Sequence, residues 1–125
     1  MIRKVFAFAI VALMAGVLFA QAKSVKITGN LIDSACAGKL ASGKDAGDKI
    51  KGHSTSCALM PNCAGSGYSV YADGKLYKLD DTGNKEAAEI LKNTETKKGL
   101  RVEVEGTVSG DKIAVTKITE VASTE

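Results

Sequence analysis

This sequence lacks a Cys-x-x-Cys motif, although it contains three cysteines and one histidine. Without that motif there is no usual pattern for a thioredoxin-like redox pair or for covalent haem attachment. A serine-nucleophile motif is also absent, and no pair of carboxylates is arranged for general acid–base catalysis. We therefore expect a protein that is not an enzyme.

Only one long apolar run is present, Val5–Phe19, and it falls short of the about 20 residues that span a bilayer. It follows the positive Arg3 and Lys4 and precedes the small-x-small triplet that ends at Ala22. This pattern predicts a signal peptide over residues 1–22 and a single mature domain over residues 23–125. Because the residue directly after the cleavage site is Lys23 and not a cysteine, we expect a periplasmic or secreted protein without a stable membrane anchor.

Clustered positive charge is missing as well. Removal of Arg3 and Lys4 with the signal peptide leaves 15 basic residues against 14 acidic ones. Nucleic-acid binding needs Lys and Arg gathered against phosphates, so nucleic acid is not an expected partner. The partner classes that remain are a small molecule, a glycan or a protein.

What the mature chain does contain is alternating apolar sequence that predicts β-strands. Asp73-Gly74 separates two β-prone runs and is a strong hairpin signal. The apolar phase shifts by one between Val115 and Ile118, which predicts a β-bulge or a strand that changes its facing. Gly106 interrupts the preceding strand, where a strongly bent strand would need a residue without a Cβ. The expected strands cover 23–33, 67–71, 75–79, 100–108 and 112–119.

A short helix is predicted between the third and fourth strands, over Lys85–Lys92. Ala87, Ile90 and Leu91 lie on one stripe at helical spacing, and the preceding residues 80–84 offer capping side chains. Three strands, a helix and two strands form the order of an OB-fold, a five-stranded barrel. We therefore expect a mainly β, OB-like barrel with one short helix, and an open meander sheet is the alternative.

The residues also resemble those of small exported bacterial OB-fold-like domains of unknown function. The resemblance spans nearly the whole mature chain and is carried by Gly29-x-x-x-Asp33-x-x-Cys36, His53-x-x-x-Cys57, Cys63, Gly67-Tyr68 and the strand Gly99–Gly106. It implies a fold and a compartment but no activity. A looser similarity, of topology alone, links the chain to periplasmic OB-fold proteins associated with stress tolerance.

All three cysteines and the histidine fall in one long connection, the loop 34–66. In an oxidising compartment, nearby cysteines are expected to form a disulfide, so Cys36, Cys57 and Cys63 are disulfide candidates with several possible pairings. Such a bond would contribute roughly 2 to 4 kcal/mol and would order the loop. The first interpretation is thus a binding or interaction module without a cofactor, whose loop is tied by a disulfide.

With three cysteines, any single disulfide leaves one thiol unpaired. The alternative interpretation is a metal site that uses all three cysteines. His53 and Cys57 are four residues apart, so they share a face if the segment 54–58 is helical. With Cys36 and Cys63 they would form a Cys3His set for Zn²⁺, or a softer site for Cu⁺ with Met60 nearby. None of these spacings is the paired motif that makes a metal site specific.

Two further side chains are candidates near this loop. Asp33 ends the first strand, where it either starts a turn or orients His53 as an outer-shell partner. Tyr68 and Tyr71 have opposite parity in the second strand, so at most one of them, with Tyr68 as the candidate, joins a ligand surface while the other contributes to the core.

Overall fold

The computed structural model describes residues 24–122, and the expected signal peptide, residues 1–22, lies outside the described residues. No helix within residues 24–122 has the length and apolar character that crossing a membrane requires. The elements are β1 (Ser24–Asp33), α1 (Ser34–Leu40), α2 (Ala46–Lys51), α3 (Thr55–Ala58), α4 (Pro61–Ala64), β2 (Tyr68–Ala72), β3 (Lys75–Leu79), α5 (Asp81–Asn93), β4 (Arg101–Ser109) and β5 (Lys112–Val121).

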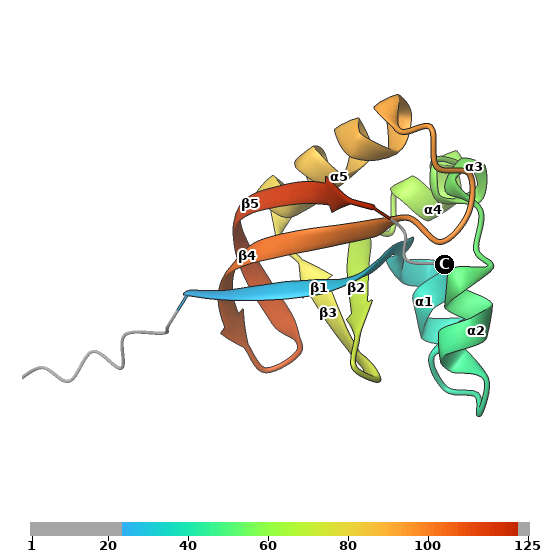
Figure 1. Cartoon of the computed structure of the whole chain (residues 1–125), viewed down its shortest axis with the longest axis horizontal. Helices are drawn as coiled ribbons and strands as arrows, with labels where there is room; N and C mark the ends of the chain where they lie inside the picture. The colour runs from blue at the N-terminus through green and yellow to red at the C-terminus, as the bar shows by residue number, and fades with distance from the viewer. Residues whose placement is uncertain (1–23, 123–125) are drawn as a thin grey trace, which may run out of the picture.

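The five strands form one mixed sheet that closes into a ring in the order β1-β2-β3-β5-β4 (Figure 1). Four of the pairings are antiparallel, and a short parallel contact between β3 and β5 completes the ring. Strand β1 pairs with β4 over residues 24–30 and with β2 over residues 30–33. The prediction of a mainly β domain with five strands is confirmed.

The main hydrophobic core lies inside the ring and is closed by α5. Ala87 and Leu91 of this helix are buried against strand residues such as Val104 and Ile113. The helix is longer than the predicted 85–92 because Asp80 caps it earlier, its Oδ1 accepting a hydrogen bond from the Gly83 N–H at 2.9 Å. A capping side chain satisfies an otherwise unpaired amide and so sets where the helix begins.

The predicted bulge is present where β4 meets β5. Glu105 pairs with Lys117 while Gly106 pairs with Val115, so Thr116 is the extra residue. A Cβ on Gly106 would collide with the carbonyl oxygen of Ala114, which confirms the expectation that this position needs no side chain. The bulge bends β5 as the ring closes.

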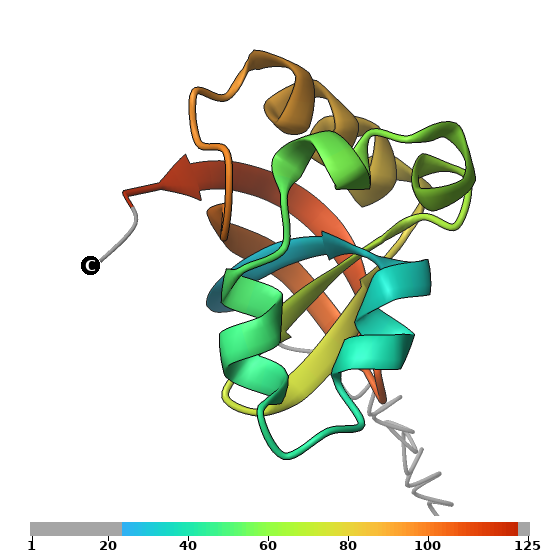
Figure 2. The same ribbon diagram turned by 90° about the vertical axis from the view of Figure 1, so that its right-hand side faces the viewer.

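The connection 34–66 was expected to be a long loop. The structure instead shows four short helices there, α1 to α4. Figure 2 shows α1 and α2 in front of the ring, with α3 and α4 beside α5. Ile32, Ala37 and Ile50 form a second, smaller hydrophobic cluster between these helices and the outer face of β1. The last five residues of β1 are therefore all buried, although its first half is half-exposed. We call the segment 34–66 the helical insert.

Candidate functional site

Each cysteine lies in a different short helix, and the three sulfur atoms converge. Cys36 is in α1, Cys57 in α3 and Cys63 in α4, and their Sγ atoms all lie within 4.8 Å of one another. All three are half-buried free thiols, so the expected disulfide is not formed in this structure. We call these residues the thiol cluster.

The thiols converge because of a repeated local pattern in the sequence. Each cysteine stands three residues after the residue that caps its helix: Asp33 for Cys36, Ser54 for Cys57 and Met60 for Cys63. Two of the caps act through side chains, since Asp33 Oδ2 accepts from the Cys36 N–H at 2.9 Å and Ser54 Oγ from the Cys57 N–H at 3.1 Å. These capping hydrogen bonds fix the backbone positions from which the two thiols project.

Ser66 ties the first and last of these helices together. Its hydroxyl donates to the Cys63 carbonyl oxygen at 2.6 Å and accepts from the Ala35 N–H at 3.0 Å. A half-buried Ser34–Ser69 hydroxyl pair, with oxygens 2.9 Å apart, also joins α1 to β2. Sequence reasoning missed Ser54 and Ser66, although Ser54 has a readable signal because serine is a preferred residue at a helix N-cap.

Asp33 and His53 form a buried pair next to the cluster. His53 Nε2 lies 3.3 Å from Asp33 Oδ1, and the two side chains are 10% and 0% exposed. Neither of these two atoms has a hydrogen bond of good geometry, which is rare for buried polar atoms and needs an explanation. Asp33 thus bonds the local backbone as the cap of α1 and lies beside His53, while its expected role of orienting the histidine as an outer-shell partner stays a prediction.

His53 does not join the three thiols in the way the spacing suggested. Helix α3 begins at Thr55, after its cap Ser54, so His53 precedes the helix rather than sharing a face with Cys57. Potential ligand atoms of His53, Asp33 and Cys36 lie within 4.8 Å of one another. Cys36 is therefore common to two adjacent groups, the thiol cluster and an Asp–Cys–His group.

The surroundings of Cys36 and Cys63 favour neutral thiols at these two positions. Burial, reinforced by a hydrogen bond from the thiol to Asp33 and the charge of that carboxylate, raises the pKa of Cys36 to about 12. Burial and the charge of Asp33 also raise the pKa of Cys63, and they raise the pKa of the Tyr68 phenol. A redox nucleophile needs a lowered thiol pKa, whereas the pKa values of Cys36 and Cys63 are raised.

The remaining predicted residues lie at the edge of the site or outside it. Tyr68 is buried in the core, and its hydroxyl donates to the Ala58 carbonyl oxygen at 3.1 Å. Tyr71 packs instead against the smaller cluster on the outer side of the ring, as the opposite parity predicts. Met60 is 55% exposed.

Comparison of the chain with protein-family models, with curated proteins and with solved structures finds no significant match. The functional argument therefore depends on the geometry of the thiol cluster and of its surroundings.

Proposed function

We propose that this protein binds one thiophilic metal ion, Zn²⁺ or Cu⁺, through Cys36, Cys57 and Cys63. The observation that carries the proposal is the convergence of three free thiols, from three separate helices, within 4.8 Å. Zn–S bonds are about 2.3 Å long, which puts the sulfurs of a tetrahedral site roughly 3.8 Å apart. A small contraction of the cluster would therefore be sufficient to hold the ion.

The raised thiol pKa values support a role for a cation rather than a catalytic one. Thiols bind metal as thiolates, and burial and the charge of Asp33 disfavour the thiolate form. The positive charge of a bound ion would offset both effects. The basic side chain that faces Asp33 is His53, which carries a positive charge only when it is protonated. A metal ion would compensate the thiolates and stabilise the insert at the same time.

His53 and Asp33 have different roles for the two ions. Zn²⁺ prefers four ligands, and His53, already grouped with Cys36, is the candidate for the fourth. Asp33 would then orient the imidazole, as carboxylates commonly do for metal-bound histidines. Cu⁺ is a soft ion that thiolate ligands select, so for Cu⁺ the three cysteines would act without His53.

The wider setting is part of the same proposal. We place the domain among OB-like barrels, because its ring of five strands has the helix between the third and fourth strands. The resemblance to small exported domains with the Asp-x-x-Cys and His-x-x-x-Cys pattern supports a periplasmic or secreted location. The function proposed there is non-enzymatic metal binding by the helical insert.

A disulfide-tied binding module is the second candidate, and the same convergence supports it. In an oxidising compartment two of the three thiols could pair before a metal arrives, and the third would stay free. The two candidates differ in what the sulfur atoms hold, which is directly measurable.

The test is native and denaturing mass spectrometry of unreduced protein isolated from the periplasm, together with a thiol count. Metal binding predicts one ion per chain and three reactive thiols after chelation. Cys57→Ser should weaken binding by more than about 100-fold, which exceeds the usual effect of losing an outer-shell partner. Ala35→Ser, at an exposed neighbouring position, is the matched control and should bind normally.

His53→Ala separates the two metals, since it should weaken Zn²⁺ binding and leave Cu⁺ binding unchanged. One disulfide and one free thiol, with no ion taken up even by the reduced chain under anaerobic conditions, would refute metal binding and support the second candidate.

A further inference from the structure

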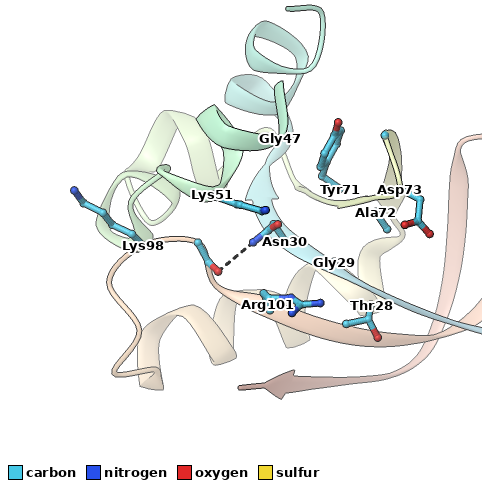
Figure 3. A pocket seen from close by; sticks show the side chains of 12 residues that line it. Thr28, Gly29, Asn30, Gly47, Lys51, Tyr71, Ala72, Asp73, Lys98 and Arg101 are labelled. Carbon is cyan, nitrogen blue, oxygen red and sulfur yellow. Dashed lines mark hydrogen bonds between the residues drawn. The ribbon is translucent and has the colours of Figure 1, made fainter. Parts of the chain in front are cut away.

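A cavity of about 630 Å³ lies on the outer side of the ring, apart from the thiol cluster (Figure 3). Its wall is made by the middle of β1, the end of β2 with the following turn, helix α2 and the segment that leads into β4. This volume falls within the range of small-molecule sites. No cysteine or histidine of residues 24–122 lines it, so its function is separate from metal binding.

The cavity exists because β1 changes partner at Asn30. That residue is paired with Tyr71 on one side and with Arg101 on the other, so β2 and β4 both flank β1 at this point. The Asn30 side chain donates a hydrogen bond to the Gly99 carbonyl oxygen at 3.1 Å, which holds the segment before β4 beside β1. Asn30 is 7% exposed and forms the fixed floor of the cavity.

The charges around this floor are mostly positive. Lys51, Lys98 and Arg101 line the cavity, against the single carboxylate of Asp73. In Figure 3, Lys51 extends toward Asn30 from one side and Arg101 lies along β4 on the other side, whereas Lys98 points away. The next outward residue of β4, Glu103, is not part of the cavity wall. An anion at the floor would therefore be contacted mainly by Lys51 and Arg101.

The far wall offers an apolar surface. Tyr71 is half-buried and its ring rests on the small cluster around Ile50, so the ring is held in place. A Cβ built on Gly47 would stand 3.9 Å from the Tyr71 ring, so the absence of a side chain there leaves room in front of it. A ligand with a flat apolar part can contact this ring while its charged part reaches Lys51 and Arg101.

We propose that this cavity binds a small organic anion that combines a phosphate or carboxylate group with an aromatic or apolar portion. The anionic group lies between Lys51 and Arg101 above Asn30, and the apolar portion lies against Tyr71. The proposal does not depend on the metal site, because no residue is shared between the two.

The test uses phenyl phosphate as the probe and follows amide resonances of the full mature chain by NMR. We expect saturable shifts centred on Gly29, Gly47 and Gly99, and weaker binding by inorganic phosphate, which lacks the ring. Phenol, which lacks the phosphate, should not bind measurably.

Variants locate the contacts. Lys51→Gln should weaken phenyl phosphate binding by about tenfold, the usual effect of losing one charge-assisted contact. Lys49→Gln changes the same helix by the same charge outside the cavity and should stay within twofold. Gly47→Leu keeps the charges and fills the space before Tyr71, so it should also weaken binding.

Three results would overturn the proposal: no saturable shifts up to about 10 mM probe, equal weakening by Lys49→Gln and Lys51→Gln, or equal binding by the wild type and Gly47→Leu. Equal weakening would mean that the probe responds only to the overall charge of α2. The same spectra, recorded before the probe is added, verify that each variant is folded.

Discussion

At the scale of single residues, Asp33 connects the start of the helical insert to the thiol cluster. It is fully buried, caps α1 through Oδ2 and faces His53 through Oδ1. Its charge also raises the pKa of two thiols and one phenol around it. This buried carboxylate stabilises the start of the insert through the capping hydrogen bond of Oδ2, whereas Oδ1 lies beside His53 without a hydrogen bond of good geometry.

Asp33→Ala should therefore destabilise the reduced, metal-free protein by about 2 kcal/mol, because it removes the cap and leaves the His53 nitrogen without its carboxylate. Asp33→Asn keeps an oxygen that can accept from the Cys36 N–H, and it should cost about half as much. Urea unfolding measures both. Asp45→Ala is the control, because Asp45 stands at the cap position of α2 without a side-chain hydrogen bond, so its loss should change stability by less than about 0.5 kcal/mol. Equal losses at positions 33 and 45 would contradict the capping role.

At the scale of the elements, α5 packs very closely against the ring near its N-terminus. Gly83 in its first turn is buried, and a Cβ there would stand 2.6 Å from Val115 Cγ2 and 3.0 Å from Leu79 Cβ. The helix thus approaches β5 at a point that only glycine allows.

Gly83→Ala should destabilise the protein by about 1 to 2 kcal/mol, because the overpacking exceeds the gain in helix propensity. Gly38→Ala is the matched control in α1, where nothing lies within 4 Å of the added Cβ. The control should be neutral or stabilise by up to about 1 kcal/mol. Thermal melting compares the two, and a Gly83→Ala protein as stable as the Gly38→Ala protein would show that α5 can move outward without loss.

The elements that the sequence predicts correctly are those whose signals are local. Strand alternation, the Asp73-Gly74 turn and the apolar stripe of Ala87 and Leu91 each lie within one segment, and all appear in the structure. The helices of the insert escape prediction because they are four to seven residues long, too short for a helical period to show. Their readable signals are the capping side chains of Asp33 and Ser54, which precede the helices in the chain.

At the scale of the whole molecule, long-range placement determines the sites that local patterns do not predict. No short motif brings Cys36 to Cys63; their convergence depends on α1 and α4 both being anchored by Ser66. The anion cavity likewise arises from β1 pairing with two strands, and its wall combines Lys51 with Arg101, fifty positions apart in the chain. Such sites follow from register and packing, which periodicity does not encode.

The two hydrophobic clusters also divide the molecule into parts of different stability. The main core has twelve buried residues and includes Ala58 of α3, whereas α1 and α2 are held to β1 by a buried cluster of three, Ile32, Ala37 and Ile50. Without metal, α1 and α2 have little other apolar packing, so we expect this part of the insert to open while the ring stays folded.

Hydrogen exchange of the reduced, metal-free chain tests this division with two substitutions. The Val104 side chain becomes exposed only when the ring unfolds, so Val104→Ala should lower the opening free energy of β4 amides by about 2 kcal/mol and leave the Ala41 and Gly52 amides of the insert unchanged. The Ile50 side chain becomes exposed when either the insert or the whole chain opens, so Ile50→Ala should lower both opening free energies by about 2 to 4 kcal/mol. If Val104→Ala lowered the opening free energy of the insert amides as much as that of the β4 amides, the ring and the insert would unfold as one unit. Metal binding would then stabilise the whole domain rather than the insert alone.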